Sequence, residues 1–117
     1  MGASFFFSYK KYEGRTTQVA YSASKGAVRS MTLPLARDLA RYNIRVVTIS
    51  PGPFKTPLTD TFTERVHNGM LQAGVLFPRR YGEPEEFAAT VKWILDCSYV
   101  NGEVIRLTGG GRIPSRL

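Results

Sequence analysis

The sequence predicts an α/β fold in which helices cover a sheet of parallel strands. Short apolar runs rich in β-branched and aromatic residues alternate with longer stretches in which apolar residues recur at helical spacing. The predicted order is strand, helix, strand, loop, helix, helix, strand. Because parallel neighbours need a long crossover connection, this alternation favours parallel pairing. The 117 residues fit a single domain that can bury a core.

The first strand and a long helix account for the first third of the chain. Residues 3–8, ASFFFS, form an apolar run that suits a buried strand ending at Ser8. From Val19 to Tyr42, apolar residues recur every four positions, which predicts a long amphipathic helix. Pro34 lies inside this helix and removes one backbone hydrogen bond, so we expect a kink there. We expect the helix to end at Asn43, a residue type that is common at helix ends.

A second strand follows the long helix directly. Residues 44–50, IRVVTIS, are β-branched and apolar without interruption, as expected for a strand covered on both faces. The run stops at residues 51–53, PGP, which break regular structure. Residues 59–73 predict a weaker helix, with Thr59 or Asp60 as its N-cap.

The last predicted helix begins at residues 84–86, Pro-Glu-Glu, because proline suits an opening position and acidic side chains suit the helix dipole. Its predicted apolar face is formed by Phe87, Val91, Ile94 and Leu95. Asn101-Gly102 predicts a turn, and residues 102–110 supply a last strand. Ligands of parallel sheets bind at the carboxyl ends of the strands. We therefore expect the loops after the three strands to converge there.

Composition limits the classes of function. The net charge of +7 and the pI near 9.9 suit an anionic partner, but the basic residues are spread along the chain, so we do not favour nucleic-acid binding. The single cysteine, Cys97, excludes an internal disulfide and fits a reducing compartment. His67 is the only histidine. No second ligand is near it, so we expect it to be a surface residue, and no metal site is predicted. No apolar run approaches the ~20 residues of a membrane helix, and no targeting segment is recognised.

Tyr21 and Lys25 form the most informative pair in the sequence. They stand four residues apart near the start of the long helix, so their side chains share one face. A free phenol loses its proton only near pH ~10 and needs a nearby positive charge to act in proton transfer at neutral pH. A cation at ~4 Å contributes about 4 kcal/mol at an effective dielectric of ~20. Such pairs also occur without function, and the spacing alone leaves both interpretations open.

Further residues around the pair match a known protein family. The chain resembles the short-chain dehydrogenase/reductase family, which carries a Tyr-x-x-x-Lys pair in an alanine- and serine-rich surround, matched by YSASKGA at residues 21–27. The serine that precedes this tyrosine at a strand end is matched by Ser8, and a Pro-Gly followed by Thr is matched by PGPFKT at residues 51–56. The resemblance implies that residues 1–117 form a single partial domain, the carboxyl-terminal half of a Rossmann-like doubly wound parallel sheet.

The resemblance also implies roles for individual residues. Tyr21 would be the general acid/base, Lys25 would stabilise its phenolate, and Ser8 would donate a hydrogen bond to the substrate oxygen. The residues implied to contact the cofactor, NAD, are Tyr21, Lys25, Pro51, Gly52, Phe54 and Thr56. Outside this resemblance, Ser8 also fits a strand-end cap, Phe54 a loop hydrophobe and Thr56 a turn residue.

A narrower resemblance within the family is carried by MTLPLARDLA, FPRRYGEPEEFA and NGEVIRL. It implies oxidation of a secondary alcohol such as 3-hydroxyacyl-CoA or a hydroxysteroid, NAD as cofactor, a mitochondrial location and a homo-oligomer. The Gly-rich dinucleotide fingerprint does not occur in the 117 residues. An alternative therefore stays open, a truncated and inactive fragment that acts as an oligomerisation module or co-assembles with a full-length relative.

Overall fold

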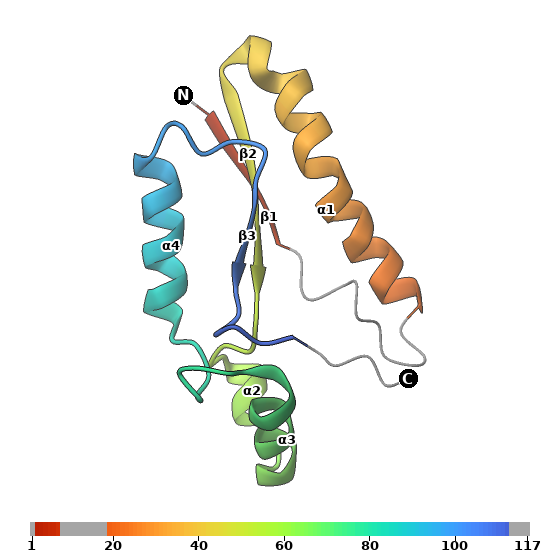
Figure 1. The fold of residues 1–117 in the computed structure, drawn as a ribbon, viewed down its shortest axis with the longest axis vertical. Helices are drawn as coiled ribbons and strands as arrows, with labels where there is room; N and C mark the ends of the chain where they lie inside the picture. The colour runs from red at the N-terminus through yellow and green to blue at the C-terminus, as the bar shows by residue number, and fades with distance from the viewer. Residues whose placement is uncertain (1, 8–18, 113–117) are drawn as a thin grey trace.

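The computed structural model describes residues 2–7 and 19–112, and Figure 1 shows their arrangement. The secondary structure elements, in chain order, are β1 (Gly2–Phe7), α1 (Val19–Leu39), a 3-10 turn (Ala40–Tyr42), β2 (Ile44–Pro51), α2 (Pro57–Asp60), α3 (Glu64–Gly74), α4 (Pro84–Asp96) and β3 (Val104–Leu107). The three strands form one parallel sheet in the order β1-β2-β3. The predicted α/β class and parallel pairing are confirmed.

Two helices cover the two faces of the central strand. Thr48 of β2 shares a buried 2.6 Å hydrogen bond with Thr32 of α1. Its neighbours in the strand, Val47 and Ile49, instead form the core cluster with Ile94 of α4. Because successive side chains of a strand point to opposite faces, α1 and α4 lie on opposite sides of the sheet, as Figure 1 shows.

A buried arginine attaches the end of α4 to the sheet. The side chain of Arg45, at the start of β2, donates hydrogen bonds to the backbone oxygens of Ile94, Cys97 and Val100 through Nη1 and of Leu95 through Nη2. These carbonyls belong to the last turn of α4 and the loop after it, where helix geometry leaves oxygens without partners. Arg45 therefore caps α4 from a neighbouring element of the fold.

The long helix and the second strand lie where the sequence predicts them. α1 continues through Pro34 to Leu39, and Asn43 ends the following 3-10 turn in the left-handed conformation, at φ 59°. In β2 the six residues between the first and the last are all buried, as predicted for a strand covered on both faces. β3 lies within the predicted run 102–110, and β1 overlaps the predicted run 3–8 but begins one residue earlier, at Gly2.

The prediction of a single helix over residues 59–73 is wrong. α2 and α3 are separate helices, and Thr56 caps α2 instead of Thr59 or Asp60. Thr56 and Thr59 form a reciprocal capping box around Pro57, which starts α2 earlier than predicted. The predicted apolar face of α4 also needs a correction, because Leu95 is 51% exposed while Ile94 is fully buried.

Candidate functional site

The carboxyl ends of β2 and β3 bring two loops together. The backbone N–H of Gly52 donates a 2.7 Å hydrogen bond to the oxygen of Leu107, the last residue of β3. A Cβ at Gly52 would lie 3.0 Å from the Cα of Thr108, so the two backbones are in close contact. Gly52 therefore serves the packing of the loop after β2, defined here as residues 51–56, against the turn after β3.

Tyr21 and Lys25 lie in the first turns of α1. The Nζ atom of Lys25 is 5.9 Å from the centroid of the Tyr21 ring, within the range of a cation–π contact. Tyr21 is 44% exposed. The helix thus presents a phenol and an ammonium group side by side, with room for a ligand to reach the phenol.

Ser8 lies outside the described residues, so its position relative to Tyr21 stays a prediction. β1 ends at Phe7, whose Cα partner in β2 is Ile49. The carboxyl end of β1 is therefore beside the end of β2, next to the loop 51–56.

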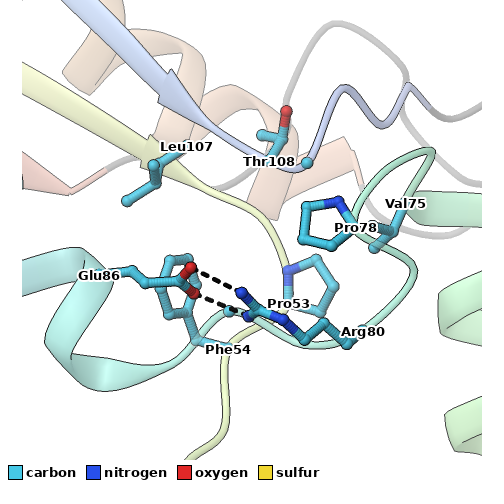
Figure 2. A pocket seen from close by; sticks show the side chains of 10 residues that line it. Pro53, Phe54, Val75, Pro78, Arg80, Glu86, Leu107 and Thr108 are labelled. Carbon is cyan, nitrogen blue, oxygen red and sulfur yellow. Dashed lines mark hydrogen bonds and ion pairs between the residues drawn. The ribbon is translucent and has the colours of Figure 1, made fainter.

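A pocket of about 200 Å³ lies between this loop, the start of α4 and the end of β3 (Figure 2). The residues that line it are Pro53, Phe54, Val75, Pro78, Arg80, Gly82, Glu86, Leu107, Thr108 and Gly109. Most of this wall is apolar. Its charged part is the ion pair between Arg80 and Glu86, whose carboxylate and guanidinium face each other in Figure 2.

The ion pair is held by several hydrogen bonds. Arg80 donates to both carboxylate oxygens of Glu86, at 2.9 and 2.8 Å, and also to the backbone oxygen of Tyr81. Glu86 accepts a further 2.8 Å hydrogen bond from the backbone N–H of Glu83, at the N-cap of α4. The bond from Arg80, followed by the one from Glu83, lowers the pKa of Glu86 from 4.5 to about 2. The hydrogen bond to Glu86 raises the pKa of Arg80.

Phe54 is fixed by the segment that precedes α4. It forms a parallel bridge with Gly82, flanked by hydrogen bonds from Gly82 N–H to the oxygen of Pro53 (3.0 Å) and from Lys55 N–H to the oxygen of Gly82 (2.9 Å). An ion pair between Lys55 and Glu83 adds a side-chain link between the same two segments. The loop 51–56 is thus held in register with residues 82–83.

A second link joins α3 to the same segment. Tyr81 is 7% exposed, and its hydroxyl is 2.8 Å from Nδ1 of His67 and 3.5 Å from Sδ of Met70, both on α3. Burial raises the pKa of Tyr81. His67, predicted to be a surface residue without a second ligand, is therefore half-buried in a packing contact with Tyr81 and Phe62.

The predicted site residues fall into two groups. Tyr21 and Lys25 are on α1, on one side of the sheet, and neither lines the pocket. Phe54 lines the pocket and packs edge-to-face on Phe87 of α4, on the other side, with ring centroids 5.8 Å apart. The two groups are separated by the ends of the strands, where Pro51 and Gly52 lie.

Thr56 is exposed, and its hydroxyl takes part in a hydrogen bond with the helix that follows it. Its hydroxyl accepts a 3.2 Å hydrogen bond from the backbone N–H of Thr59 at the start of α2. The same hydroxyl donates a long, 3.5 Å hydrogen bond to Oγ1 of Thr59. A hydroxyl has two acceptor lone pairs and one donor hydrogen, so one lone pair is left for a ligand. Thr56 therefore serves as a helix cap whatever else it contacts.

Sequence reasoning missed most of the pocket wall. Val75, Pro78, Arg80 and Glu86 were not candidates, because they come from a loop and a helix start that meet only in the folded chain. Only Glu86 could have been anticipated in part. It is the third residue of a helix that begins after Glu83, and an acid at this position commonly forms a capping box.

Two absences concern the described part of the chain only. Over residues 2–7 and 19–112, no helix has the length and apolar composition that crossing a membrane requires. Within the same ranges, no three His, Cys, Asp or Glu side chains gather closely enough to hold a metal ion.

Comparison with known proteins establishes the class of protein. A family model described as enoyl-(acyl carrier protein) reductase matches residues 4–111. The chain belongs to the short-chain dehydrogenase/reductase family of oxidoreductases, as its Tyr-x-x-x-Lys helix and its Rossmann-type half-sheet indicated.

Within that family the similarity is narrower. The chain is 53% identical to 3-hydroxyacyl-CoA dehydrogenase type-2 of Mus musculus over 106 residues, which cover 91% of this chain and 40% of that protein. It is 38% identical to a 3-oxoacyl-[acyl-carrier-protein] reductase of Thermotoga maritima, over 83% of this chain and 39% of the other. The crystal structure of 3-hydroxyacyl-CoA dehydrogenase type-2 from Mycobacterium avium superposes with a TM-score of 0.88 at 38% identity, covering 98% of this chain and 45% of that one. The chain thus spans about 40% of the length of these curated relatives.

Proposed function

We propose that this chain carries the proton-transfer residues of an NAD-dependent oxidoreductase that oxidises a secondary alcohol, either a 3-hydroxyacyl-CoA or a hydroxysteroid. The observation that carries the proposal is the placement of Lys25 Nζ 5.9 Å from the Tyr21 ring, on a helix whose phenol is 44% exposed. Membership of the family and the similarity to proteins named 3-hydroxyacyl-CoA dehydrogenase type-2 support it.

In this proposal Tyr21 is the general base for the alcohol. Its hydroxyl oxygen accepts the proton of the substrate hydroxyl, and the ammonium of Lys25 stabilises the phenolate that does so. Ser8 donates a hydrogen bond to the substrate oxygen, where negative charge develops. General base catalysis of this kind contributes roughly 100- to 10,000-fold to the rate.

The donor set of the described residues fits a nicotinamide nucleotide. Such a ligand presents ribose hydroxyls and a carboxamide, which pair with an ammonium and with hydroxyls. Lys25 and Tyr21 supply these groups from α1, and Thr56 supplies an exposed hydroxyl beside the strand ends. Pro51, Gly52 and Phe54 would support the nicotinamide ring from the loop 51–56. When bound, NAD supplies the hydride acceptor.

The first test is the binding of NAD to the 117-residue chain, measured by calorimetry at up to millimolar cofactor. We expect saturable binding that weakens in Lys25→Met. Tyr99→Phe is a matched control for Tyr21→Phe, because Tyr99 is 99% exposed. In a chain that turns over 3-hydroxyacyl-CoA, Tyr21→Phe should lower kcat about 100-fold or more while Tyr99→Phe leaves it unchanged. Equal turnover of the two variants would refute the role of Tyr21.

The second candidate function is an oligomerisation or interaction module. One observation favours it: α1 buries Thr32 and Ala36 but leaves Val19, Met31 and Leu33 exposed at 81%, 42% and 47%. These side chains lie on different sides of the helix, and a homo-oligomer, or co-assembly with a full-length relative, would cover part of this exposed apolar surface. A mitochondrial location remains part of the proposal through the family resemblance alone.

Light scattering after size exclusion tests the second candidate. We expect the chain to elute as an oligomer, or together with added full-length 3-hydroxyacyl-CoA dehydrogenase type-2, and Met31→Glu to shift it to the monomer. Elution of the wild-type chain as a monomer, separate from the relative, argues against the module.

A further inference from the structure

Gly82 occupies a position that no larger residue can share with Phe54. A Cβ built on Gly82 would lie 2.6, 2.7 and 2.8 Å from Cε1, Cζ and Cδ1 of the Phe54 ring. Carbon atoms in contact are ordinarily about 3.5–4.0 Å apart. The ring therefore lies directly over the Gly82 Cα, in space that a side chain would fill.

The reason for this glycine is steric and not conformational. The glycines with a left-handed backbone in the described residues are Gly102, Gly109 and Gly110, and Gly82 is not among them. An alanine could adopt the backbone of Gly82, but its methyl group would meet the ring. The requirement for glycine at this position is thus set by Phe54.

We propose that Gly82 is a positioning residue that places Phe54, and with it the loop 51–56, for binding of the nicotinamide nucleotide. This inference rests on the proposed function. In the proposed function Gly82 contacts neither substrate nor cofactor, and it acts only through the ring of Phe54.

Phe87 limits the directions in which the ring can move away. The Phe54 ring meets Phe87 edge-on at an interplanar angle of 89°. Phe87 itself packs against the core cluster of Val47, Ile49 and Ile94. A methyl group at Gly82 must therefore push the ring into the pocket or move the loop.

The backbone transmits such a movement along the loop. Gly82 N–H binds the oxygen of Pro53, and the oxygen of Gly82 binds the N–H of Lys55, so the residues on both sides of Phe54 are tied to Gly82. Displacement at Gly82 changes either these two bonds or the ring. Thr56, the next residue of the loop, carries the hydroxyl assigned above to the nucleotide.

The test is a double-mutant cycle on the 117-residue chain. Gly82→Ala, Phe54→Ala and the double variant are compared with Gly69→Ala, a matched control because a Cβ at Gly69 on α3 meets nothing within 4 Å. The dissociation constant for NAD is measured by calorimetry. We expect on the order of tenfold weaker binding for Gly82→Ala, because the added methyl group displaces the ring or the loop; in catalysis, a misplacement of ~1 Å can lower a rate ~100-fold. Gly69→Ala should match the wild type.

The cycle separates action through the ring from a general effect. In the Phe54→Ala background, Gly82→Ala should weaken NAD binding by less than about twofold, because the contact is gone. An equal loss in both backgrounds overturns the proposal. The NOE between the Phe54 and Phe87 rings should weaken in Gly82→Ala, and unchanged resonances of both rings also overturn it.

Two further outcomes distinguish the inference from the proposed function. If the wild-type chain binds NAD and Gly82→Ala binds it equally well, the positioning role alone is wrong. If the wild-type chain binds no NAD, the proposed cofactor fails and the positioning role fails with it. Unfolding of Gly82→Ala that is rescued in the double variant assigns the glycine to the stability of the fold, and overturns a role in binding.

Discussion

Replacing Arg45 by methionine tests how the sheet holds α4. Arg45 is 8% exposed and donates four hydrogen bonds to backbone oxygens at the end of α4, between 2.9 and 3.2 Å. Methionine keeps the apolar stem of the side chain, which packs much like that of arginine. It removes the guanidinium and leaves the oxygens of Ile94, Leu95, Cys97 and Val100 without this partner.

The expected loss in the free energy of unfolding is the sum of opposing effects. Hydrogen bonds to a charged group contribute ~1.5–3 kcal/mol each, and buried oxygens that lose a partner cost a similar amount. Two effects reduce the loss. Among the residues that the structure describes, Nε of Arg45 has no hydrogen-bond partner although it is buried, a cost that methionine abolishes. Leu95 is 51% exposed, so water can reach the end of the helix. We therefore expect a net destabilisation of about 3 kcal/mol.

Urea denaturation followed by circular dichroism measures this loss. The midpoint should fall while the slope of the free energy of unfolding against urea stays constant, because the surface exposed on unfolding is unchanged. Arg37→Ala, an exposed arginine in the last turn of α1, is the control and should stay within about 0.5 kcal/mol. A loss of less than about 1 kcal/mol for Arg45→Met would refute the reasoning, since surface arginines reach that value.

Three more substitutions test the ion pair at the pocket, the core beneath α4 and the contact between Tyr81 and α3. Because the pKa of Glu86 falls from 4.5 to about 2 on folding, its contribution to the stability of the fold is complete above pH 4.5 and is lost as the pH falls toward 2. Glu86→Gln should therefore flatten the dependence of the thermal midpoint on pH in this window. A pH profile identical to that of the wild type would contradict the pairing with Arg80. Ile94→Ala, at a fully buried position, should cost about 3 kcal/mol in urea, and a loss under about 1 kcal/mol would mean that the core there collapses. Tyr81→Phe removes the hydroxyl shared with His67 and should cost about 1 kcal/mol, with an unchanged midpoint as the contrary result.

The sequence was most informative where one physical pattern dominates. β2 is apolar and β-branched along its whole length, and it is the buried central strand. α1 carries a helical repeat across 21 residues, and the left-handed conformation of Asn43 ends the turn that follows it. In these elements local propensity and burial favour the same structure, so the pattern is enough.

The region after β2 was predicted less well because short-range hydrogen bonds decide it. The capping box between Thr56 and Thr59 starts α2 at Pro57, and the Oγ1 of Thr61 binds the oxygen of Leu58 where α2 ends. Threonine side chains can bond to nearby backbone in several ways, and hydrophobic periodicity does not distinguish among them. One weak helix in the sequence therefore became two in the structure.

The pocket was beyond prediction for a different reason. Its wall combines residues 53–54, 75–86 and 107–109, which approach each other only through parallel pairing and the packing of α4. The bond between Arg80 and Glu86 spans six positions, whereas contacting side chains on a helix are three or four positions apart. The glycine at position 82 is likewise explained only by the ring that lies over it.

The division of the site between two faces of the sheet has a consequence for ligand binding. Tyr21 and Lys25 belong to α1, and Phe54 packs on α4, so a ligand that contacts all three must pass over the carboxyl ends of the strands. At that edge Gly52 brings the loop against Thr108 without a side chain in between. Parallel sheets bind nucleotides at this end of their strands. In the proposed function one nucleotide would cross the strand ends to reach both groups, and the position of the loop held by Gly82 would decide whether it does.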